Sequence, residues 1–98
     1  MIVVQTTYSR SSIDIPWYHE SWTEEMRKYV FDNYNSTGKI EGSFFENSNR
    51  LKITFIHIFP SDEVREEWDN DYYLNMFRED RKEYNLSMGI TYEIEVQE

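Results

Sequence analysis

The chain has no cysteine, and this absence removes several chemistries together. Without thiols there can be no disulfide, no thiolate nucleophile and no cysteine-bound metal. Only three glycines and two prolines occur in 98 residues, and no low-complexity run divides the chain. Linkers and disordered chains have the opposite composition. We therefore expect a single ordered domain over residues 1–98.

Basic residues and long apolar runs are also scarce. Ten Lys and Arg stand against 19 Asp and Glu, which gives a formal net charge of −9. Nucleic acids and anionic membranes attract basic surfaces, so we expect direct binding to neither, whereas a basic protein partner suits this charge. No segment approaches the roughly 20 apolar residues of a membrane span, and the start MIVVQTTYSR does not resemble a signal peptide. These absences predict a cytoplasmic protein.

Aromatic residues, by contrast, are abundant, and the chain alternates strand and helix patterns. Residues 1–10 predict a first strand, and Ser21 with Glu24 forms a capping-box pattern that predicts a helix ending before Gly38. Residues 39–59 predict two strands around the polar turn ENSN. After Pro60, residues 61–89 predict two helices separated near residues 69–71, and residues 90–96 alternate as a half-buried strand.

This order, β-α-β-β-α-β, predicts an α+β, ferredoxin-like fold with a four-stranded antiparallel sheet, helices on one face and a kinked or split second helix. The third strand carries apolar residues on both of its faces. Ile53 and Phe55 point one way with His57, while Ile56 and Ile58 point the other way. Because helices cover only one face, we expect a second copy to cover the other and form a homodimer.

The same pattern of elements resembles the dimeric α+β barrel superfamily, which includes the antibiotic-biosynthesis-monooxygenase-like proteins. The resemblance rests on the hairpin GSFFENSNRLKITFIHIF, the step PSDEVREEW into a helix and the closing strand GITYEIEV. The stretches YSRSSIDIPWYHES and REDRKEYNLSMGI also resemble small phage-encoded proteins of no known activity. The second resemblance implies an origin in a phage, and hence the host cytoplasm, without implying a mechanism.

The first resemblance implies a substrate site between sheet and helices, where electron-rich aromatic compounds are oxidised without a bound metal. His57 is the candidate catalytic residue, with Trp22, Trp68 and Asn33 as companions. The competing interpretation makes His57 a core-edge histidine that needs only one hydrogen bond.

A second candidate site is the stretch SSIDIPWYHESWTEE. Trp17, Tyr18 and His19 could form a recognition surface, or Pro16 could fix the backbone while Trp17 and Trp22 pack against the sheet. One histidine without a second His or Cys at ligand spacing is a poor ligand set, so we expect neither a metal nor another cofactor.

Acidic residues crowd one segment of the second helical region. A solvated helix face, a divalent-cation site and a surface that imitates nucleic acid for a basic partner are the three interpretations. The residues concerned are Asp62, Glu63, Glu66, Glu67, Asp69 and Asp71.

No nucleophile elbow and no phosphate-binding loop occurs. The predicted function is therefore a small acidic, non-catalytic accessory or protein-binding module. A cofactor-independent monooxygenase-like enzyme comes second, and an acidic inhibitor of a host nucleic-acid-binding protein comes third.

Overall fold

Four strands form one antiparallel sheet in the computed structural model, which describes residues 1–98. The strand order is β2-β3-β1-β4, so β3 and β1 are central. The strands are β1 (Ile2–Ser9), β2 (Glu41–Glu46), β3 (Lys52–Phe59) and β4 (Thr91–Gln97). The predicted ferredoxin-like α+β fold is confirmed.

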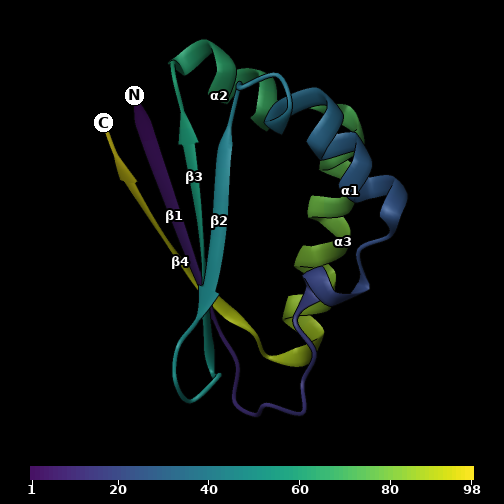
Figure 1. Cartoon of the computed structure of the whole chain (residues 1–98). Coiled ribbons are helices and arrows are strands. Elements are labelled where there is room, and N and C mark those ends of the chain that lie inside the picture. The colour runs from purple at the N-terminus through teal and green to yellow at the C-terminus, as the bar shows by residue number, and fades with distance from the viewer.

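All helices lie on one side of this sheet, and its other side is bare (Figure 1). They are α1 (Glu24–Val30), which continues into a π-helical turn, η2 (Phe31–Asn35), then α2 (Asp62–Asp69) and α3 (Tyr72–Met88). A short 3-10 turn, η1 (Tyr18–Ser21), precedes α1. We call the sheet face toward the helices the inner face and the other the outer face. No helix is long and apolar enough to span a membrane.

The second helical region is split, as predicted, because a new helix cap interrupts it. Asp71 accepts a hydrogen bond from the backbone N–H of Leu74 at 3.1 Å, so α3 starts afresh after α2 ends at Asp69. Gly89, at φ 69°, ends α3 in the left-handed conformation that glycine favours.

The predicted capping residue of α1 is wrong. Thr23 caps the helix by accepting from the N–H of Met26 at 3.2 Å. Ser21 instead donates its hydroxyl to the carbonyl oxygen of Tyr18 at 2.7 Å and closes η1. The extra turn moves the start of α1 beyond Ser21.

The core consists of two separate clusters at opposite ends of the inner face. One contains the paired residues Ile2 and Phe59, and the other contains the paired Tyr8 and Ile53. Between them, in the middle of the central strands, Val4 pairs with His57 and Thr6 pairs with Phe55. The centre of the inner face therefore carries a histidine and a threonine where a continuous core would carry aliphatic residues.

The inner face is not covered along β4. The register of β4 against β1 places Tyr92, Ile94 and Val96 on this face, yet Tyr92 is 54% and Ile94 55% exposed. On the opposite edge, Phe44 of β2 is 58% exposed. The prediction of a half-buried β4 is thus wrong for the chain by itself, because the helices pass over the central strands only.

Candidate functional site

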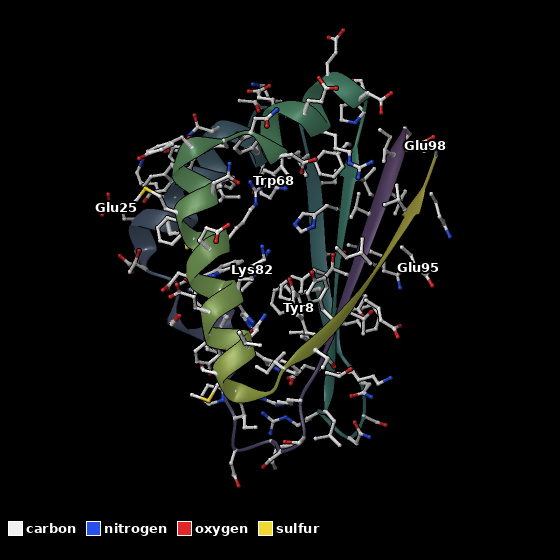
Figure 2. The ribbon with its side chains drawn as sticks, turned by 180° about the vertical axis from the view of Figure 1, so that it is seen from behind. Tyr8, Glu25, Trp68, Lys82, Glu95 and Glu98 are labelled. Atoms are coloured by element: carbon white, nitrogen blue, oxygen red, sulfur yellow. The ribbon has the colours of Figure 1, made fainter.

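His57 lies at the centre of the inner face, between the two core clusters. Its ring centroid is 5.5 Å from that of Trp68, which reaches over from α2, and 6.4 Å from that of Phe59. Figure 2 shows Trp68 and Tyr8 in the space between α3 and the sheet. The structure therefore brings together two of the predicted site residues, His57 and Trp68.

The imidazole of His57 is electrically neutral at physiological pH. Burial lowers its pKa to about 4, and the positive charges of Arg81 and Arg78 add to this effect. No hydrogen bond opposes that shift. A histidine with so low a pKa is a weak general base at neutral pH, and a catalytic base is usually oriented by a hydrogen-bonded partner as well.

Two arginines of α3 face His57, and neither forms an ion pair with a carboxylate. The guanidinium carbon of Arg78 lies 5.2 Å from the ring centroid of Trp68, and that of Arg81 lies 5.7 Å from Tyr8. Burial and the neighbouring Arg81 lower the pKa of Arg78. We call Tyr8, His57, Trp68, Arg78 and Arg81 the arginine cluster.

Sequence reasoning missed both arginines, although a signal was present. By helical spacing, Tyr73, Phe77, Tyr84 and Met88 form an apolar stripe that predicts the inward face of α3. The buried residues are Leu74 and Asn85, and Met88 is exposed. Residues 74, 78, 81 and 85 share one helix face by spacing, so this face carries arginine at two inward positions. Charged residues at such positions are unusual unless they have a function.

The other two predicted companions of His57 lie elsewhere. Asn33 is exposed on η2 and donates to the carbonyl oxygen of Tyr29 at 2.8 Å. Trp22 is half-buried beside His19, with ring centroids 6.0 Å apart, and its buried Nε1 has no hydrogen-bond partner. His19 in turn lies 5.6 Å from Phe55, the inner-face neighbour of His57 on β3.

The opening stretch is fixed to the sheet by a buried arginine. Arg10 is 6% exposed and donates to the carbonyl oxygens of Ile15 at 2.6 Å and Arg50 at 3.0 Å. Its third partner is a carboxylate oxygen of Glu46 at 3.3 Å, which also accepts from Trp17 Nε1 at 2.9 Å. Every donor of this network has a partner, so Arg10 and Trp17 hold the connection in place.

A pocket of about 180 Å³ opens beside this network. Its wall includes His19, Phe44 and Ile53 together with the charged residues Arg10 and Glu46. Tyr18 lies outside the wall and donates its hydroxyl to Asp80 of α3 at 2.7 Å. Burial, followed by this bond to Asp80, raises the pKa of Tyr18 to about 12. All three predicted recognition residues therefore make contacts within the chain, and Trp17 and His19 also line the pocket.

The acidic segment divides into two parts. Five of the predicted residues are on α2 and exposed, namely Asp62, Glu63, Glu66, Glu67 and Asp69. Glu67 pairs with Lys39 at 2.7 Å, and Asp69 with Arg65 at 3.8 Å. No group of three or more His, Asp or Glu side chains is arranged to hold a metal ion.

Asp71 differs from the other acids because it is a structural hydrogen-bond acceptor. Burial alone would raise its pKa, but hydrogen bonds from Tyr34, from the backbone of Leu74 and from Tyr29 outweigh burial and lower the pKa. Asp71 therefore ties α1, η2 and α3 together.

Among the comparisons with known proteins, one solved structure, with a TM-score of 0.61, supports the fold. No protein-family model matches the chain, and no curated protein matches it. A crystal structure of a proposed antibiotic biosynthesis monooxygenase from Deinococcus radiodurans aligns with a TM-score of 0.61 at 10% identity, over 100% of this chain and 91% of that one. A formyltetrahydrofolate deformylase from Pseudomonas putida KT2440 aligns with a TM-score of 0.36 at 14% identity, over 96% of this chain and 28% of that one.

Proposed function

We propose that this protein is a non-catalytic binding protein that holds a small apolar or aromatic ligand against the uncovered inner face of its sheet. The observation that carries the proposal is the exposure of Tyr92, Ile94 and Phe44 on the face that a ferredoxin-like domain normally covers with helices. Exposed apolar side chains that share a face mark binding surfaces in soluble proteins.

Binding is favoured over catalysis because the only candidate base is poorly suited to that role. The pKa of His57, about 4, leaves little driving force for proton abstraction at neutral pH. No neighbouring carboxylate raises the pKa of its imidazole again. A ligand on the inner face would thus contact His57 as a neutral hydrogen-bonding group.

We also propose that the protein acts as a homodimer through the outer face of the sheet. The pairing register places Val3, Ile56 and Ile58 on this face beside Thr7 and Thr54, whose hydroxyl groups are 3.0 Å apart. These central strands carry no charge on the outer face except at Lys52, which lies at the end of β3.

The acids of the outer face lie on its edges, as Glu95 does in Figure 2. Two negatively charged copies can therefore meet through neutral central strands while their acids remain in solvent. Sedimentation at micromolar concentration should give twice 12.0 kDa, and Ile56→Asp should give monomers. A parent chain that sediments as a monomer would exclude this arrangement.

An oxidising enzyme is the second candidate, because the fold match is to a proposed monooxygenase and His57 lies beside Trp68 on the inner face. An oxygen electrode distinguishes the two candidates. Oxygen uptake with dihydroxynaphthalene that His57→Gln abolishes would favour the enzyme, whereas binding without uptake would favour our proposal. The phage origin, the cytoplasmic location and the basic protein partner stay predictions from the sequence.

The binding proposal can be tested with a neutral fluorescent probe, N-phenyl-1-naphthylamine. We expect saturable binding to the parent chain and weaker binding to Ile94→Ser, by about 1 kcal/mol or roughly fivefold, because the variant loses apolar contact area. Glu95→Gln is the matched control, since residue 95 is the next position on β4 and faces outward. Equal binding to all three chains, or to none, would contradict the proposal.

A further inference from the structure

The arginine cluster places positive charge inside a strongly acidic protein. The chain has 19 acidic residues against ten basic ones, so most arginines and lysines could find a carboxylate. Five of the ten do, and Arg27, Lys52 and Lys82, which lack such a partner, are exposed. Arg78 and Arg81, on the inward face of α3, also lack one although they are partly buried.

The guanidinium of Arg78 is only partly satisfied. One of its terminal nitrogens donates to Asn75 Oδ1 at 2.7 Å and to the carbonyl oxygen of Asp69 at 3.3 Å. Its other terminal nitrogen is buried and has no partner. An unpaired buried donor on a charged group is costly, and proteins rarely leave one without a use.

A second buried donor without a partner lies on the same side of the sheet. Trp22 Nε1 is buried without a partner. Trp22 lies beside His19, which is in contact distance of Phe55 and Phe44 on the inner face. The two buried side-chain donors without a partner thus lie on the helix side of one sheet, at different points along it.

Because His57 is neutral, the positive charge of the cluster comes from Arg78 and Arg81 alone. Tyr8 and Trp68 provide the aromatic faces on which the guanidinium groups rest. Tyr92, which is exposed, lies 5.9 Å from Tyr8 between ring centroids. The cluster therefore continues directly into the uncovered surface of β4.

We propose that the inner face binds a small aromatic anion, with its ring against the exposed Tyr92 beside the buried Tyr8 and its carboxylate on Arg81 and Arg78. This inference rests on the proposed function and adds the chemical class of the ligand. Guanidinium groups recognise carboxylates through paired, charge-assisted hydrogen bonds, and aromatic side chains supply the stacking area. The unpaired terminal nitrogen of Arg78 is enclosed in the unliganded chain, so a carboxylate bonds to it only after the side chains that cover it move aside.

The test compares two ligands that have nearly the same shape and differ in charge, 2-naphthoate and 2-naphthamide, by titration calorimetry with the full chain. We expect naphthoate to bind about tenfold more tightly, as charge-assisted hydrogen bonds predict. Arg78→Gln and Arg81→Gln should each remove most of that difference and leave naphthamide binding unchanged. Lys28→Gln, which removes an equal charge from the exposed side of α1, should change neither ligand.

The outcomes distinguish a failure of the anion site from a failure of the proposed binding face. If naphthamide binds as tightly as naphthoate, or if the arginine variants keep the preference, the anion site is wrong while the binding face stands. If 2-naphthoate, 2-naphthamide and the neutral fluorescent probe all fail to bind, the proposed function itself is wrong. If either arginine variant fails to fold, the side-chain Nε–H resonances of Arg78 and Arg81 in the parent chain should still shift with naphthoate and not with naphthamide. Unmoved resonances would overturn the site.

Discussion

Replacing Trp17 with alanine should destabilise the fold strongly. The side chain is 5% exposed, its ring lies 4.2 Å from the guanidinium carbon of Arg10, and its indole N–H donates to Glu46 at 2.9 Å. Truncation of a buried tryptophan to alanine costs about 3 to 5 kcal/mol. Loss of the stacking on Arg10, itself 6% exposed, argues for the middle of this range or above, about 4 kcal/mol.

Thermal and urea unfolding, followed by circular dichroism, measure this cost. For a domain of this length each kcal/mol shifts the midpoint by about 4 to 8 °C, so Trp17→Ala should melt roughly 15 to 30 °C below the parent. Trp22→Ala is the control within the same stretch. Trp22 is half-buried and makes no hydrogen bond through its indole, so its loss should cost about 1 to 2 kcal/mol.

One result would refute this reasoning. If Trp17→Ala melts within a degree or so of the parent, the indole does not hold the connection, and the stretch SSIDIPWYHESWTEE is a recognition surface. In that case partner binding would fall while stability stayed constant. A loss for Trp22→Ala as large as that for Trp17→Ala would contradict the half-buried position of Trp22.

Two further predictions concern pH. The lowered pKa of Asp71 means that its contribution to stability is present above the ordinary Asp value of about 4 and is lost as pH falls toward the lower folded value. Asp71→Asn should thus be less stable than the parent at pH 7, by about 1 to 2 kcal/mol, and should lose less on acidification below pH ~4 in urea titrations. His57 stays neutral in the folded chain, so the unfolded chain gains a proton first and stability should fall between pH ~6.5 and the folded pKa of about 4. His57→Gln should lack that decline in melts recorded from pH 7 to 4, and an unchanged decline would show that other groups cause it.

The order of elements was predictable because local signals mark each boundary. Pro60 ends β3, Gly89 adopts the positive φ that closes α3, and the polar turn ENSN separates β2 from β3. The start of α1 was not predictable to the residue. Ser21 and Thr23 are both good caps, and the choice between them depends on the turn η1, which forms through contacts with α3 and the sheet.

The candidate site was predictable in part. Alternation along β3 places His57 on one face with Phe55, and the helical spacing of Val64 and Trp68 puts Trp68 on an apolar face of α2. Arg78 and Arg81 could not be found by a search for apolar stripes, because the inward face of α3 carries charge in the middle of its length. Only the folded structure, which sets Arg78 beside Trp68 and Arg81 beside Tyr8, shows that this charge faces the polar centre of the sheet.

The exposure of β4 illustrates a further limit of sequence patterns. Alternation shows which side chains of Tyr92, Ile94 and Val96 share a face, but it carries no information on whether a helix covers that face. Coverage depends on the path of α3, and that path depends on which inward residues the helix offers. Arginines need room and a polar neighbour, so a helix with Arg78 and Arg81 inward cannot pack as closely as one with leucines.

Charge on the outside and charge on the inside act on a ligand over different distances. The net charge of −9 repels anions at long range, and salt screens this repulsion beyond about 8 to 10 Å. Arg78 and Arg81 attract an anion only at hydrogen-bonding distance, where water is partly excluded and their attraction is strongest. An anion without an aromatic part would meet the repulsion and gain little from Tyr8 or Tyr92, and a neutral aromatic compound would leave the guanidinium unpaired. The combination of an acidic exterior with the arginine cluster therefore selects compounds that carry both a ring and a negative charge.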